Sequence, residues 1–200
     1  MFNKSSIWRC TSSDGINWRY RSNVPYAFES RDNTGYPYQA YRVNAPWVLP
    51  EQAQYHVWFT NYDGNNRRIQ YACFDHSLTP IGPFMQGGLS LYHETDLSDP
   101  TVIRTNNDYF MAFTRGDGPE KRIGFAYSND VKIWTQDINY ATDLWPGEAD
   151  AWDSRIIWCP SLMYDGHEYR LWYLGTNGEM VGLGTARSSD GQIWQKDPGG

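Results

Sequence analysis

The chain has 200 residues, 40% hydrophobic and 20% charged, a balance typical of a globular domain and not of a disordered chain. Its formal charge of −6, from 17 basic and 23 acidic side chains, argues against a basic surface and so against nucleic acid as a partner. Aromatic residues make up 16%, while 18 glycines and 11 prolines supply many chain reversals. This composition favours short strands, and we predict an all-β fold.

The first residues lack the apolar core of a secretion signal, and no apolar run reaches the roughly 18 residues of a membrane helix. We expect no membrane association, and the cytoplasm is slightly favoured, although the localisation stays open. The histidines show no metal-ligand spacing and no nucleotide motif occurs, so we expect neither metal nor cofactor. The cysteines form no CxxC pair, and we expect all of them to be buried as small hydrophobes: Cys10, Cys73 and Cys159.

The N-terminal residues 1–24 match only the end of a unit that recurs three times further along the chain. Each full unit has a proline, a tyrosine nine residues later that opens an alternating apolar stretch, and a glycine eighteen residues after the proline. The three sets are Pro46, Tyr55 and Gly64, then Pro100, Tyr109 and Gly118, then Pro160, Tyr169 and Gly178.

A period of 54 to 60 residues with four short strands is typical of a β-propeller blade. We predict blades at 38–84, 92–138 and 152–197, with the outer half of a preceding blade at 1–24, about three and a half blades in all. Such a ring is incomplete, so the chain is expected to be a fragment, a truncated product, or a protein that closes by self-association. The alternative is that residues 1–40 form an irregular cap.

An Asp-x-x-x-Trp unit ends the half blade and two of the full blades, at Asp14 to Trp18, Asp130 to Trp134 and Asp190 to Trp194. A short carboxylate in a tight turn accepts local backbone N–H bonds, and the tryptophan can pack between blades. We therefore expect these aspartates to be structural. The spacing of four differs from the spacing of five in the Asp-box of sialidases.

The pattern Ser-Ser-Asp-Gly-x-x-Trp at the end of a blade, with Asp-Pro opening another, resembles the five-bladed glycosidase-like superfamily of arabinanases, β-xylosidases, invertases and levansucrases. The closest resemblance is to its uncharacterised glycosyl-hydrolase-like members, through Trp152-Asp153-Ser154, Pro160-Ser161 and Ser188 to Trp194. It covers nearly the whole chain, and it implies a carbohydrate ligand at the central funnel. In the resembled families, an Asp directly before an inner-strand proline and a Glu two residues before such a proline supply the two acids of catalysis.

Asp99 is the one residue that keeps the first pattern, and no Glu keeps the second, because Asn44, Ser98 and Trp158 stand two residues before the prolines. Glycoside cleavage needs two carboxylates. The missing proton donor has three explanations: it lies in absent blades, it is another acid (Asp153, Glu148 or Glu94), or the protein binds sugar without cleaving it. Asp153 is the preferred substitute, since Trp152 could stack on a sugar and raise the pKa of the carboxyl; it could equally cap a turn.

Propeller geometry places the starts of the inner strands and the loops between second and third strands on one face, where a ligand binds. The candidate catalytic residues on this face are Asp99 and Asp153. The candidate substrate-binding residues are Arg42, Asn44, Asp96, Arg115, Asp117, Arg155 and Trp158. Further polar residues expected there are Asn61, Asp63 and Asn177, and Tyr41 and Trp47 are possible stacking rings, although packing between blades is favoured for Trp47.

Three functions therefore remain after the sequence analysis. The first is a glycosidase-like enzyme with Asp99 as base or pKa-modulating acid. The second is a carbohydrate-binding propeller without turnover, and the third is an interaction scaffold without any sugar dependence. Because propellers host many functions, the fold alone does not choose among them.

Overall fold

The computed structural model describes residues 6–7, 10–20, 28–29, 42–62, 64–77, 79, 81, 96–106, 108–136, 139 and 141–198. Within these ranges the only helix is a 3₁₀ turn of three residues, Gly118–Glu120. None of the described residues forms a helix that is long and apolar enough to cross a membrane. The predicted all-β fold is confirmed.

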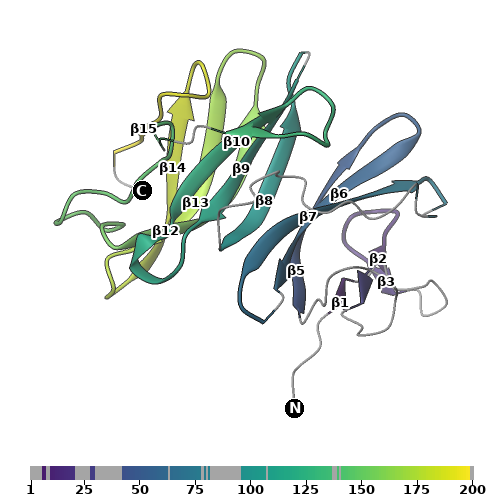
Figure 1. Ribbon diagram of the computed structural model, residues 1–200, viewed down its shortest axis with the longest axis horizontal. Coiled ribbons are helices and arrows are strands. Elements are labelled where there is room, and N and C mark those ends of the chain that lie inside the picture. Colours follow the sequence, from purple (N-terminus) through teal and green to yellow (C-terminus); the bar gives the residue numbers. More distant parts are fainter. Residues whose placement is uncertain are drawn as a thin grey trace.

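Three antiparallel sheets follow one another along the chain and are arranged like a fan (Figure 1). The first blade has three strands in the described residues: β5 (Arg42–Pro50), β6 (Gln54–Tyr62) and β7 (Arg67–Asp75). The second blade has β8 (Leu97–Arg104), β9 (Tyr109–Arg115), β10 (Arg122–Ser128) and β11 (Thr135–Gln136). The third blade has β12 (Ile156–Tyr164), β13 (Tyr169–Thr176), β14 (Val181–Ser188) and β15 (Gln195–Lys196).

Neighbouring blades pack face to face through apolar and aromatic side chains. Because successive side chains of a strand point to opposite faces, a blade with neighbours on both sides buries nearly every residue of its central strands. In β9 of the second blade six of seven residues are buried, whereas β13 of the third blade alternates between buried and accessible positions. The first interface contains Trp58, Ile69, Tyr71, Met111 and Phe113, and the second contains Phe110, Ile123, Phe125, Leu171 and Tyr173.

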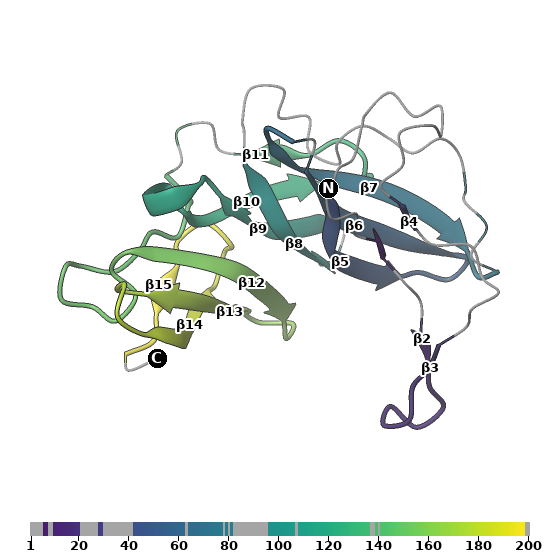
Figure 2. The ribbon, with the colours of Figure 1, turned by 90° about the horizontal axis from the view of Figure 1, so that it is seen from below.

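The N-terminal segment forms two short strand pairs, β1 (Ser6–Ile7) with β4 (Phe28–Glu29) and β2 (Cys10–Thr11) with β3 (Arg19–Tyr20). The β2–β3 hairpin lies at the end of the fan opposite to the third blade (Figure 2). Its register equals that of the outer strands of the other blades, since Cys10 pairs with Tyr20 as Ala186 pairs with Lys196. Ile7 packs on a buried apolar cluster of the first blade that contains Val57 and Phe59. That residues 1–24 form the outer half of a blade stays a prediction.

The Asp-x-x-x-Trp units have the predicted local hydrogen bonds. Asp130 Oδ1 accepts the backbone N–H groups of Lys132 and Ile133 at 2.9 and 2.8 Å, and the indole of Trp134 donates to a carbonyl three residues earlier. The units at Asp14 and Asp190 make the same bonds. The structural interpretation of the three aspartates is confirmed.

The expectation that all three cysteines are buried is wrong. Cys10 and Cys159 are exposed, and Cys73 is half-buried. Cys10 lies in the two-residue strand β2 of the N-terminal hairpin, and Cys159 lies at a register shift of the inner strand β12.

Candidate functional site

The inner strands β5, β8 and β12 share one irregularity, at the residue before the proline. Each strand pairs with its neighbour on both sides of this point, but the register shifts there. Ala45, Asp99 and Cys159 occupy the point with φ of 47°, 53° and 51°. A positive φ is uncommon for residues other than glycine and costs free energy, so its repetition in three blades marks a built feature of the fold.

Threonines of the preceding blade stabilise this backbone. The amide of Asp99 donates to Thr60 Oγ1 at 2.9 Å, and the amide of Cys159 donates to Thr114 Oγ1 at 3.0 Å. Thr60 and Thr114 are equivalent positions on β6 and β9. Each hydroxyl therefore satisfies an amide that the register shift removes from the strand ladder.

Asp99 presents its carboxylate beside the Cys159 thiol. Ser98 Oγ donates a hydrogen bond to Asp99 Oδ2 at 2.9 Å, and the Asp99 side chain stays partly accessible. Desolvation, and then the negative charge of Asp99, raise the pKa of the Cys159 thiol to about 12. Two inner-strand residues of neighbouring blades thus face one another, which is the convergence expected at the axis of a propeller.

This pairing predicts a change in thiol reactivity. Asp99→Asn removes the negative charge, so the pKa of Cys159 falls, the thiolate fraction at pH 8 rises, and alkylation by iodoacetamide speeds up severalfold, up to about tenfold for each pKa unit. Site-resolved mass spectrometry measures the rate at Cys159, with Cys10 as internal reference. An unchanged ratio of the two rates would show that Asp99 and Cys159 do not interact.

A second group of predicted residues meets at an arginine that sequence analysis missed. Arg67 Nη1 lies 3.0 Å from Asp117 Oδ1 and 4.0 Å from Asp96 Oδ1. The hydrogen bond from Arg67 holds the pKa of the Asp117 carboxyl below its usual value. Arg67 begins β7, a few residues after Asn61 and Asp63, which the sequence analysis placed in the loop between the second and third strands.

Arg115 does not point to solvent, contrary to its predicted role in substrate binding. The residue is 3% exposed, and its Nη1 lies 3.3 Å from Asp143 Oδ2, while Nη2 donates to Gln136. Asp143 also accepts from Arg122 Nε at 2.8 Å. The guanidinium belongs to a buried ion network that ties β9 and β10 to the segment leading to the third blade.

Asp153 is also placed away from solvent. The residue is 2% exposed, and its Oδ2 accepts from Tyr173 Oη at 2.9 Å and from Lys196 Nζ at 2.5 Å. Burial, and then the hydrogen bond to Asp153, raise the pKa of Tyr173 well above its ordinary value. Trp152 stacks on Tyr173 with ring centroids 6.0 Å apart. Its ring therefore packs on the sheet, whereas the sequence had suggested that it could stack on a sugar. Both contacts occupy the carboxylate of Asp153 inside the third blade, so it is not presented to a ligand.

The other candidates divide into accessible residues, packed residues and residues that are not described. Arg42, Asn44, Arg155 and Glu148 are exposed, and Trp158 is partly buried on β12. Trp47 packs at the first blade interface and donates from Nε1 to the carbonyl of Val102, as favoured from the sequence. Tyr41, Asp63 and Glu94 lie outside the described residues. In the described ranges, no group of three His, Cys, Asp or Glu side chains is placed to hold a metal ion.

No protein-family model and no curated protein matches the sequence. Solved structures do match: a family 117 glycoside hydrolase, Zg3597, from Zobellia galactanivorans has a TM-score of 0.65 at 15% identity, over 78% of this chain and 55% of that chain. β-1,2-mannobiose phosphorylase from Listeria innocua matches with a TM-score of 0.66 at 14% identity, over 93% and 50%. Endo-arabinase from Bacteroides thetaiotaomicron matches with 0.64 at 15% identity, over 91% and 68%.

These similarities show the fold of the chain. The chain has the fold of the five-bladed glycosidase-like β-propellers that its sequence resembles, as a partial propeller. It spans about half the length of the first solved structures that it matches.

Proposed function

We propose that the chain binds a carbohydrate at the ends of the inner strands, with Asp99 as the residue that contacts the sugar. The observation that supports this proposal most directly is the Asp99 carboxylate, which is partly accessible and occupies a left-handed backbone position repeated in three blades. A carboxylate accepts hydrogen bonds from sugar hydroxyls, and such charged bonds are among the strong ones.

The residues that stand at the position of Asp99 in the first and third blades favour binding over hydrolysis. Ala45 and Cys159 stand where a second and a third acid would converge on Asp99, and Asp153 is paired with Lys196. Hydrolysis needs a second carboxylate, at about 5 Å from the first for retention of configuration or farther for inversion. The enzyme hypothesis therefore requires a proton donor other than Asp153 and other than the residues at these two inner-strand positions.

The test uses isothermal titration calorimetry with β-1,2-mannobiose and arabino-oligosaccharides, chosen after the matched phosphorylase and endo-arabinase. We expect one of them to bind to the wild type. Asp99→Ala should weaken this binding more than tenfold, while Asp99→Asn, which keeps an acceptor oxygen, should retain it. Alanine suits the backbone position, because Ala45 occupies the equivalent point of the first blade.

Asp108→Ala is the matched control, because Asp108 is an exposed aspartate in the turn after β8, away from the inner strands' register shifts. Equal binding by the wild type and Asp99→Ala would contradict the proposal, as would the absence of binding at millimolar sugar. Release of reducing sugar by the wild type, lost in Asp99→Asn with binding intact, would favour the enzyme over the binding protein.

A further inference from the structure

In the second and third blades, the tryptophan of the Asp-x-x-x-Trp unit packs on the preceding blade. Trp134 of the second blade meets Trp58 of the first edge to face, with ring centroids 6.0 Å apart at 83°. Trp194 of the third blade stacks on Phe125 of the second, at 4.7 Å and 4°. We call the side chains of one blade that receive the tryptophan of the next unit a tryptophan socket.

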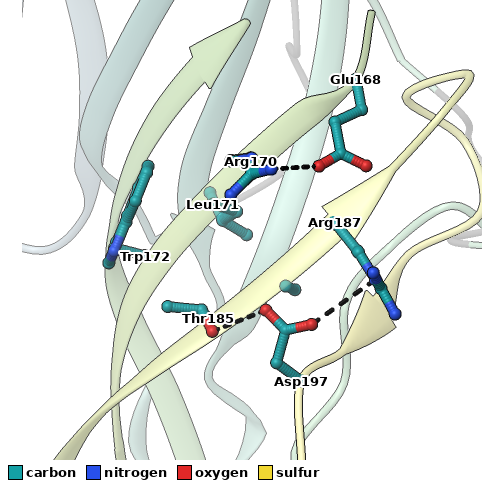
Figure 3. Close-up of a pocket in the computed structure, with 8 residues that line it drawn as sticks. Glu168, Arg170, Leu171, Trp172, Thr185, Arg187 and Asp197 are labelled. Carbon is teal, nitrogen blue, oxygen red and sulfur yellow. Dashed lines mark hydrogen bonds and ion pairs between the residues drawn. The ribbon is translucent and has the colours of Figure 1, made fainter. Parts of the chain in front are cut away.

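The third blade has a socket of the same construction that no tryptophan among the described residues enters. The strand pairings make Trp172 and Thr185 equivalent to Trp58 and Tyr71, and Arg170 and Arg187 flank them. These four residues line a pocket of about 180 Å³ (Figure 3). A cavity of about 150 Å³ holds a benzene ring, so the pocket has the size for an aromatic side chain.

The apolar surface around this socket is also uncovered. Leu183 is 59% exposed, whereas its equivalents Ile69 and Ile123 in the other two blades are 1% and 0% exposed. Val181 and Met163 on the same blade are 63% and 42% exposed. Exposed apolar residues gathered on one blade face are typical of an interaction surface.

The N-terminal hairpin carries a unit that has no socket among the described residues. Asp14 Oδ1 accepts the amides of Ile16 and Asn17 at 2.9 and 2.8 Å, so the turn is formed as in the other units. Trp18 is nevertheless 63% exposed, while Trp134 is 3% exposed. The hairpin and the third blade lie at opposite ends of the fan (Figure 1), so Trp18 cannot reach the socket of its own chain.

We propose that two copies of this chain associate head to tail, with Trp18 of one copy in the tryptophan socket of the third blade of the other. The unit and the socket are complementary surfaces on different parts of one chain, which is the condition for a heterologous contact. The proposal is independent of carbohydrate binding, because the socket and the register shifts at Asp99 lie on different strands.

Two features of the third blade favour this partner. Its socket is lined by polar pairs, Arg170 with Glu168 at 2.7 Å and Arg187 with Asp197 at 3.5 Å, so guanidinium groups are available to lie against an indole face. Its strand β13 has Leu174 where Thr60 and Thr114 bind the inner strand of a following blade. The exposed face of the third blade therefore lacks the hydroxyl that would accept the inner-strand amide of a following blade, but it keeps the tryptophan socket. A hairpin that supplies outer strands only, such as β2–β3, fits such a face.

The test is sedimentation equilibrium of the full chain with two complementary variants. Trp18→Ala removes the indole, and Thr185→Trp fills the socket. We expect the wild type to associate at micromolar concentration and each variant to dissociate about 30-fold more readily, the effect of losing an interface anchor. An equimolar mixture should recover a one-to-one complex, since one variant keeps an open socket and the other keeps Trp18.

Ile16→Ala is the matched control, because Ile16 lies in the same turn and is 81% exposed. Its association should equal that of the wild type, and far-UV circular dichroism verifies that every variant is folded. A monomeric wild type, unchanged association of Trp18→Ala, or no complex in the mixture would each overturn the proposal. Binding of a free saccharide by a monomer, lost in Thr185→Trp, would identify the pocket as a sugar site instead.

Discussion

Replacing Asp143 with alanine is expected to lower the free energy of unfolding by about 3 to 5 kcal/mol, the range for removing one partner of a buried ion pair. The side chain of Asp143 is 1% exposed and faces two guanidinium groups, Arg115 and Arg122, whose side chains are 3% and 10% exposed. Alanine leaves both cations in the interior without this carboxylate. Urea unfolding measures the loss, and a change of this size is a large fraction of the stability of a single domain.

The control for this effect is Asp150→Ala, which removes an exposed aspartate from the segment before the third blade. Its stability should stay within about 0.5 kcal/mol of the wild type, as for surface substitutions in general. Equal stability of Asp143→Ala and the wild type would show that the two arginines do not depend on this carboxylate.

Replacing Asp153 with alanine is expected to destabilise the chain by about 2 to 4 kcal/mol. Two partners lose their acceptor: the buried Tyr173 hydroxyl and the ammonium of Lys196. The Lys196 side chain is 25% exposed, so water compensates part of its loss, and the effect is smaller than at Asp143. Thermal and urea unfolding give the value.

The same variant separates a structural from a catalytic role for Asp153. In a double-mutant cycle, Asp153→Ala and Lys196→Met should be strongly non-additive, because the second substitution removes the charge that the first leaves unpaired. The exposed Asp150→Ala, from the connecting segment before the third blade, is the control. If Asp153→Ala is as stable as the wild type but loses sugar binding or cleavage, Asp153 belongs to the site after all.

The blade repeat, the strands and the Asp-x-x-x-Trp turns were all predictable because they depend on short sequence distances. Side-chain alternation has a period of two, and the hydrogen bonds of Asp130 reach two and three residues along the chain. These local patterns recur three times, so their spacing defines the blades. Asp99 was singled out because the dipeptide Asp99-Pro100 matches a pattern of the resembled glycosidase-like superfamily, and its role stays a proposal.

The partners of the remaining candidate residues come from contacts between residues that are far apart in the sequence. Asp153 meets Lys196 over 43 positions, and Arg115 meets Asp143 through a segment that links two blades. Nothing local distinguishes an arginine that binds a ligand from one that neutralises a buried acid. The sequence by itself determined the strands, the blades and the turns, because local geometry controls them. The tertiary structure decided which charged and aromatic residues are buried and which remain free, because that depends on the blade that packs beside them.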